Sequence, residues 1–263
     1  MRPALIDICF NFAHSAFRED AEAVLQRAGE AGVTRMLVTG STLEDSATCI
    51  ELAATYPDRL YATVGTHPHY ASQWHAGAPA RVRELADHPK VKAIGEAGLD
   101  FNRNYSTEAE QVRAFTAQLE LAVALQLPVF MHEREARPRF VEILDRYLAD
   151  LPRAVVHCFT GSEADLDAYL ERDLYIGVTG WICDERRGRH LHDILAKIPA
   201  DRLLLETDAP YLLPRSLRPK PASRRNEPAY LPEVLRVVAA ALGAPEAEVA
   251  ANTTANACRF YGL

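Results

Sequence analysis

Four side chains that can bind a metal ion come directly after short apolar runs of this sequence, and they are Glu96, His132, His157 and Asp208. The spacing between them is about one or two strand–helix units, so they are expected at the ends of different strands. If these strands are parallel neighbours, their carboxyl ends meet on one side of a sheet. Imidazole and carboxylate groups together suit Zn, Mn, Mg or Fe, and the absence of a thiolate argues against a structural zinc site.

The chemistry expected of such a site is hydrolysis. A divalent metal lowers the pKa of a bound water molecule and polarises the scissile bond, while a second carboxylate accepts the proton. A single His after a strand is more often a hydrogen-bonded residue without a catalytic role, and Glu96 alone could be a carboxylate at a helix start. Four such residues at equivalent positions favour the metal site. His67, in the segment Gly-Thr-His-Pro-His that follows another apolar run, is expected at the same edge.

Eight short aliphatic or β-branched runs alternate with helical patterns along the chain. The strands are expected at 5–12, 36–39, 61–65, 91–95, 128–132, 154–158, 175–178 and 203–206. Strands that alternate with helices pair in parallel through right-handed crossovers. The sequence therefore predicts a single domain over residues 1–263, of the α/β class, with a (β/α)8 TIM barrel fold. An open doubly wound sheet is the alternative, but no Gly-x-Gly-x-x-Gly loop follows the first strand.

Composition and charge exclude several classes of protein. The 263 residues are 48% hydrophobic, which excludes a disordered chain, and no segment approaches the 18 consecutive apolar residues of a membrane span. The five cysteines never form a Cys-x-x-Cys pair, so we expect no disulfide framework and a reducing, cytoplasmic location. The net charge of −7 leaves no global basic face for nucleic acid, so contact with a polyanion must come from a local patch.

A local basic patch is predicted in the proline-rich segment 210–232, which follows the eighth strand. Five cations between residues 215 and 227, including Arg224 and Arg225, stand against one acid. Barrel enzymes often bind phosphate at this place. We therefore expect Arg224 and Arg225 to bind substrate, although a solvated run of charges is the simpler interpretation.

Two further residues are candidates for substrate binding. Thr160 begins a predicted helix directly after His157, where free N–H groups could bind a phosphate oxygen. Trp181 lies in a loop after the seventh strand, and its ring either stacks on a base or packs in the core.

Five of the candidates, His67, Glu96, His157, Thr160 and Asp208, lie in sequence blocks that resemble the TatD family of metal-dependent deoxyribonucleases. The blocks are GTHPH (65–69), GEAGLDF (95–101), HCFTG (157–161) and ETDAPY (206–211), and the resemblance covers about residues 4 to 261. It implies a TIM barrel of the metallo-dependent hydrolase type that hydrolyses phosphodiester bonds. It also implies 3′-to-5′ exonuclease action on single-stranded DNA and RNA, with a role in DNA repair or nucleic-acid degradation.

The resemblance assigns roles to individual residues. Glu96, His132, His157 and Asp208 match the metal ligands of the family, and we expect Glu96 and Asp208 to take part in catalysis. His67 matches a position close to the metal or the scissile phosphate. We expect the protein to be a monomer whose substrate is single-stranded DNA or RNA. We expect no membrane among its partners.

One departure from the family pattern concerns the first strand. Most relatives begin with Asp-x-His-x-His, but here Cys9 and Asn11 occupy the two His positions, as they do in one subgroup of the family. Either one metal binds firmly, or a second site is weak and rich in oxygen ligands. The loss of two imidazoles shifts the expected metal to Mg²⁺, with Mn²⁺ or Zn²⁺ as alternatives. Cys9 is either a thiolate ligand or, more simply, a small apolar side chain in a strand.

Two other classes of function stay open at this point. One is a related metallohydrolase, such as a D-aminoacyl-tRNA deacylase or a small-molecule amidohydrolase. Many amidohydrolases carry a carbamylated lysine at a strand end, whereas the fourth strand here ends at Glu96. The other is a non-catalytic barrel that binds nucleic acid, and the complete set of metal-binding residues argues against it.

Overall fold

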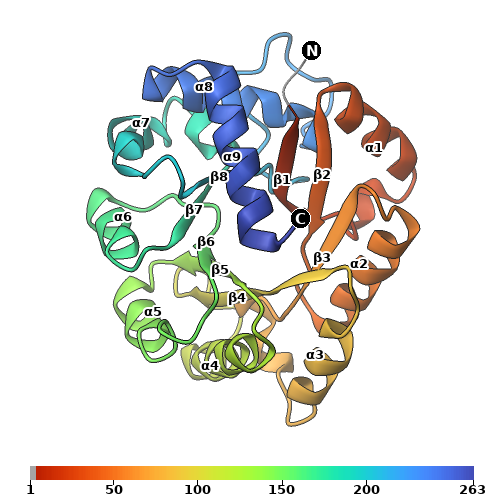
Figure 1. Ribbon diagram of the computed structural model, residues 1–263, viewed down its shortest axis with the longest axis vertical. Helices are drawn as coiled ribbons and strands as arrows, with labels where there is room; N and C mark the ends of the chain where they lie inside the picture. Colours follow the sequence, from red (N-terminus) through yellow and green to blue (C-terminus); the bar gives the residue numbers. More distant parts are fainter. Residues whose placement is uncertain (1–3) are drawn as a thin grey trace. The chain divides into compact units, whose positions relative to one another are not determined.

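The computed structural model describes residues 4–263, and every expected strand is present (Figure 1). One sheet contains the eight strands in chain order, which are β1 (Leu5–Phe10), β2 (Val33–Val38), β3 (Leu60–Val64), β4 (Val91–Asp100), β5 (Val129–Arg134), β6 (Ala154–Val156), β7 (Tyr175–Val178) and β8 (Leu203–Leu205). A parallel bridge joins Phe10 of β1 to Ala209, beyond β8. This order, with helices between the strands, is the (β/α)8 topology predicted from the sequence.

Nine α-helices are described in residues 4–263. They are α1 (Ala21–Glu30), α2 (Leu43–Thr55), α3 (Ala78–Ala86), α4 (Glu108–Leu125), α5 (Arg137–Leu144), α6 (Glu163–Leu170), α7 (Arg189–Ile194), α8 (Leu231–Leu242) and α9 (Glu246–Tyr261). Helix α4 begins with a capping box in which Thr107 and Glu110 each bond the other's backbone N–H. Across the described part of the chain, no helix combines the length and apolarity needed to cross a membrane.

Two strands differ from the expected ranges by three residues or more at one end. Strand β2 begins at Val33 instead of Met36. The exposed Thr34 and the half-buried Arg35 lack the apolar character of the buried end of the strand, so the sequence pattern does not reveal this start. Strand β4 continues to Asp100 instead of ending at Gly95. Its last residues include two glycines and two acids, which are poor strand formers, so the sequence pattern does not reveal this extension.

The contacts divide the described chain into two compact units. Unit 1 comprises residues 4–37, 158–166 and 175–263, and unit 2 comprises residues 38–157 and 167–174. In unit 1, the ring of Phe10 lies 4.8 Å from that of Phe12 and 5.0 Å from that of Phe17, measured between centroids. In unit 2, Phe115 of α4 stacks on Phe140 of α5 with centroids 5.0 Å apart. Each unit therefore has its own aromatic core, and a single domain over residues 1–263 stays a prediction.

Candidate active site

The carboxyl end of β4 places two buried acids in unit 2. Gly95 and Gly98 have φ values of +144° and +145°, and a Cβ atom on Gly98 would stand 1.8 Å from the carbonyl oxygen of His132. Strand β4 therefore approaches β5 more closely than residues with side chains allow. The pairing shifts register between Ile94 and Ala97, and beyond that shift Gly98 faces His132. Glu96 and Asp100 are both buried at this irregular strand end.

Three histidines converge on one oxygen of Glu96. Its Oε1 atom lies 2.7 Å from His157 Nε2, 3.2 Å from His132 Nδ1 and 3.2 Å from His67 Nε2. His67 follows β3, His132 belongs to β5 and His157 follows β6, so four consecutive strands of unit 2 contribute one side chain each. We call these residues the Glu96 cluster. The structure thus brings together His67 and three of the four residues that the sequence nominated as metal ligands.

A second carboxylate borders the Glu96 cluster. The Oδ2 atom of Asp100 lies 2.7 Å from His69 Nε2 and 3.3 Å from His132 Nε2. Backbone N–H groups of Asn102 and Arg103 donate to Oδ1 of the same carboxylate. Neither His69 nor Asp100 was predicted from the sequence to have a role. The available signal was the spacing of Glu96 and Asp100, four residues apart, which places both on one face of a strand once β4 is known to continue.

Burial and hydrogen bonding together determine the charges of the cluster. Burial favours the neutral form of Glu96, but the interactions of its carboxylate with the imidazoles of His67, His157 and His132 outweigh it, so the pKa of Glu96 is well below its ordinary value. Burial lowers the pKa of His67 to about 4 against the opposing effect of Glu96. Glu96 is therefore an anion and His67 a neutral imidazole near pH 7, which are the forms that bind metal ions.

Two neighbouring imidazoles keep Asp100 ionised as well. Burial alone would raise the pKa of Asp100, but the imidazoles of His132 and His69, which lie 3.3 Å and 2.7 Å from its Oδ2 atom, lower it far below the ordinary value. Burial acts to lower the pKa of His132, and the adjacent carboxylates of Asp100 and Glu96 reverse this and raise it.

The donor atoms of the cluster fit a divalent metal ion. One donor atom from each of His67, Glu96 and His132 lies within 4.8 Å of the other two. Bonds of about 2.1 Å to one tetrahedral ion place neighbouring ligand atoms roughly 3.4 Å apart, close to the separations seen around Glu96. Nitrogen and carboxylate oxygen donors without a thiolate suit Mg²⁺, Mn²⁺, Fe²⁺ or Zn²⁺.

The remaining acid of the predicted ligand set, Asp208, belongs to unit 1. It follows β8 with a φ of +55°, and its backbone N–H donates to the carbonyl of Cys9. The Oδ1 atom of Asp208 accepts hydrogen bonds from Asn11 Nδ2 at 2.9 Å and from Cys9 Sγ at 3.6 Å. Asn11 and Cys9, both in or directly after β1, therefore contact Asp208 directly.

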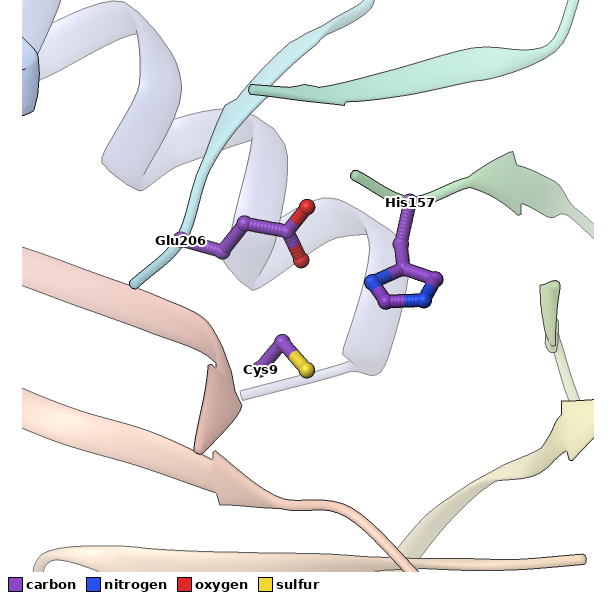
Figure 2. A group of neighbouring side chains, drawn as sticks. All are labelled: Cys9, His157 and Glu206. Carbon is purple, nitrogen blue, oxygen red and sulfur yellow. The ribbon is translucent and has the colours of Figure 1, made fainter. Parts of the chain in front are cut away.

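Glu206 is an additional buried acid of unit 1, and no role was predicted for it from the sequence. Its carboxylate is fully buried and accepts a hydrogen bond from the backbone N–H of Cys158. Figure 2 shows the carboxylate of Glu206 directed toward the thiol of Cys9, and their donor atoms lie within 4.8 Å of each other. The signal in the sequence was its place directly after the apolar run of β8, two residues before Asp208.

The two arginines expected to bind substrate have different environments in unit 1. Arg224 is exposed. The guanidinium of Arg225 instead lies 2.7 Å from Asp20, donates to the carbonyl of Ala16, and lies 5.1 Å from the ring centroid of Phe17. Arg225 therefore ties the proline-rich segment to the start of α1, and the same role is not available to Arg224.

The other two candidates for substrate binding also lie in unit 1. Thr160 is half-buried, and its carbonyl faces Nε2 of His190 at 3.3 Å. Of the N–H groups expected to be free there, that of Ser162 donates to Asp165 at 2.8 Å in the cap of α6. Trp181 is half-buried, with the guanidinium of Arg187 4.2 Å from its ring centroid. One face of the Trp181 ring is therefore already covered.

A family model described as "TatD related DNase" matches residues 6–262. The chain is 52% identical over 259 residues to "3'-5' ssDNA/RNA exonuclease TatD" of Pectobacterium parmentieri (strain WPP163), covering 98% of this chain and 100% of that protein. It is 54% identical over 257 residues to the protein of the same name from Cronobacter turicensis (strain DSM 18703 / CCUG 55852 / LMG 23827 / z3032), covering 98% and 97%.

Solved structures agree with the barrel topology. A hydrolase TatD family protein from Entamoeba histolytica superposes with a TM-score of 0.89 at 26% identity, over 99% of both chains. YJJV, a TATD homolog from Escherichia coli k12, superposes with a TM-score of 0.88 at 32% identity, over 98% of both chains. The (β/α)8 fold is thus shared with these proteins.

Proposed function

The chain belongs to the TatD related DNase family and is a hydrolase of phosphodiester bonds, and we propose that it removes nucleotides from the 3′ ends of single-stranded DNA and RNA. The observation that carries the proposal is the Glu96 cluster, in which one nitrogen atom of each of three imidazoles lies within 3.2 Å of the same oxygen of a buried carboxylate. Its relatives of more than half identity are named for this activity. A role in DNA repair or nucleic-acid degradation follows from the same substrates.

We propose that Glu96, His132 and His157 hold a divalent metal ion, with Asp208 as a further ligand. The metal that we propose is Mg²⁺, since Cys9 and Asn11 offer no imidazole beside Asp208. When bound, the ion supplies an acidic water molecule and withdraws charge from the scissile phosphate.

The side chains have distinct tasks in this proposal. Glu96 stays ionised because the surrounding histidines favour its charged form. Asp208 accepts the proton of the attacking water, and Asn11 and Cys9 orient its carboxylate through their hydrogen bonds. His67 is neutral near pH 7 and orients the substrate phosphate beside Glu96. Thr160, Trp181 and Arg224 contact the strand, and the contacts of Arg225 favour an anchoring role over direct binding.

We also propose an oligomeric state, a domain organisation and a location for the protein. The chain acts as a monomer, it forms one domain over residues 1–263, and it works in the cytoplasm. The five free cysteines support a reducing compartment.

The test is a denaturing gel of 5′-labelled single strands of DNA and RNA incubated with Mg²⁺. A regular ladder that shortens from the 3′ end is expected, and EDTA should abolish it. Glu96→Gln keeps the shape of the side chain but removes its charge, so the rate should fall by at least about 10³-fold, the scale of losing a metal-activated nucleophile. Intact strands with every divalent metal tried, together with hydrolysis of an aminoacyl ester or amide, would overturn the proposal.

A further inference from the structure

Two exposed tyrosine rings of unit 2 adjoin the Glu96 cluster. Among the described residues, the large hydrophobic side chains that are exposed are Tyr70 at 43%, Tyr105 at 65% and Tyr211 at 52%. The ring of Tyr105 packs edge-on against His69 with centroids 4.8 Å apart, and the ring of Tyr70 packs edge-on against His67 at 6.4 Å. The His67 and His69 rings are themselves 4.2 Å apart. The buried imidazoles of the site and the two exposed tyrosine rings are therefore joined by a series of ring contacts.

The loop that carries Tyr105 is held in place by buried polar groups. The hydroxyl of Ser106, which is 3% exposed, donates to the carbonyl of His69 and accepts from the backbone N–H of Ser72. The buried side chain of Gln111 accepts from the N–H of Asp100 and donates to the carbonyl of Ser106. The backbone directly after Tyr105 and that of Asp100 are therefore held in place, while the Tyr105 side chain stays largely exposed beside His69. A ring that is ordered before binding loses little conformational entropy when a ligand stacks on it.

We infer that Tyr105 and Tyr70 form a stacking subsite for nucleobases of the strand whose phosphate lies beside Glu96, an inference that rests on the proposed function. Every base has a π-face, so the subsite accepts bases without regard to sequence. Arg103, whose Nη1 atom donates to the hydroxyl of Tyr105 at 3.4 Å, is exposed and supplies a cation next to the ring. This cation suits the phosphate of a neighbouring nucleotide.

Tyr105 is better placed for this task than the tryptophan nominated from the sequence. Arg187 already covers one face of the Trp181 ring. The rings of Tyr105 and His69 meet at an interplanar angle of 77°, so His69 does not stack on a face of Tyr105. Stacking of a base on an aromatic side chain is worth about tenfold or more in affinity. Tyr105 is therefore expected to contribute to binding of the substrate and not to the chemical step.

The experiment measures binding of single strands that lack one base. A fluorescent oligonucleotide and three versions, each abasic at one of the three nucleotides nearest the 3′ end, are titrated with the full-length Glu96→Gln protein in Mg²⁺, so that the strand is not degraded. With Tyr105 present, one abasic strand should bind about tenfold more weakly than the complete strand. In the Tyr105→Leu background, this penalty should disappear, because the ring that stacked on the missing base is gone.

Tyr105→Phe is the matched control, since it keeps the ring and removes only the hydroxyl. It should bind like the parent protein, and equal weakening by the Phe and Leu substitutions would overturn stacking. An unchanged abasic penalty in Tyr105→Leu would do the same. Cleavage by otherwise unaltered proteins separates this inference from the proposed function. If the wild type shortens the strand but Tyr105→Leu leaves KM unchanged, only the subsite fails. If the wild type does not shorten the strand, the proposed function fails.

Discussion

His132 lies between two carboxylates, and this placement decides which of its nitrogens can bind a metal ion. Nδ1 faces Glu96 at 3.2 Å and Nε2 faces Asp100 at 3.3 Å. If Nδ1 binds the metal ion as proposed, that nitrogen carries no proton, so the ring proton resides on Nε2, where the ionised Asp100 stabilises it. In this proposal, Asp100 is a positioning residue that fixes the tautomer and orientation of His132.

Replacing Asp100 by Asn tests this role. The amide cannot stabilise the Nε2 proton as an ionised carboxylate does, so metal affinity should fall about 10- to 100-fold, with a similar loss in kcat/KM. Calorimetric titration of the metal-stripped protein with Mn²⁺ measures the affinity. Asp145→Asn is a matched control in the same unit, because Asp145 pairs with Arg172 on the surface. If Asp100→Asn and Asp145→Asn bind Mn²⁺ equally well, Asp100 does not position His132.

At the scale of elements, the end of β4 depends on Gly98. Its φ of +145° is strained for any residue with a side chain, and the added Cβ would collide with the backbone of β5. Gly98→Ala should therefore lower the free energy of unfolding by more than about 2 kcal/mol, as measured by urea denaturation. The loss of activity should exceed the loss of folded protein, since β4 carries both Glu96 and Asp100.

Gly243 separates the effect of φ from the effect of the collision. It caps α8 at a φ of +62°, and nothing lies within 4 Å of the Cβ that a substitution would add. Gly243→Ala should therefore cost only the conformational strain, about 1–2 kcal/mol. Equal destabilisation by the two substitutions would show that close approach of β4 to β5 contributes nothing.

The ion pair of Arg225 with Asp20 connects the proline-rich segment to α1, and its contribution depends on pH. Arg225 is the strongest influence that lowers the pKa of Asp20, to about 2, and Arg27 adds to it. Because the folded pKa is below the ordinary value of 3.8, the stabilisation is present above about pH 4 and is lost as the pH falls toward 2. Arg225→Ala should cost up to about 1 kcal/mol of unfolding free energy at pH 7.

Denaturation curves of wild type and Arg225→Ala at several pH values measure this dependence. The difference in unfolding free energy should shrink as the pH is lowered from about 4 toward 2, where Asp20 becomes protonated in both states. Arg224→Ala is the control and should leave the unfolding free energy unchanged within about 0.5 kcal/mol, since its side chain is exposed. A constant difference across this range would contradict the role of Asp20.

At the scale of the whole molecule, the sequence predicts the order of elements better than the contacts between them. The eight strands are visible because strands buried on both faces require continuous apolar runs, and the family resemblance is confirmed. The continuation of β4 is not visible, because close packing against β5 selects glycine there. The pairing of Arg225 with Asp20 joins residues 205 positions apart, and composition alone makes Arg225 equivalent to Arg224.

The net charge of −7 makes the binding of a polyanion depend on a few cations that are not already paired with acids. Each phosphate contact to a single strand contributes about 0.7 to the slope of log K against log salt concentration. Arg224→Ala should therefore lower the magnitude of that slope by about 0.7 and weaken binding of all base sequences alike, because phosphate contacts carry no sequence information. Arg225→Ala should change the slope much less, since Asp20 already neutralises its guanidinium.

Fluorescence anisotropy of one labelled strand at increasing NaCl measures both slopes. Arg236→Ala, which removes a partner of Glu233, is a control elsewhere in unit 1. If Arg225→Ala flattens the plot and Arg224→Ala does not, the guanidinium of Arg225 leaves Asp20 to meet the strand, and the assignment of the two arginines is reversed.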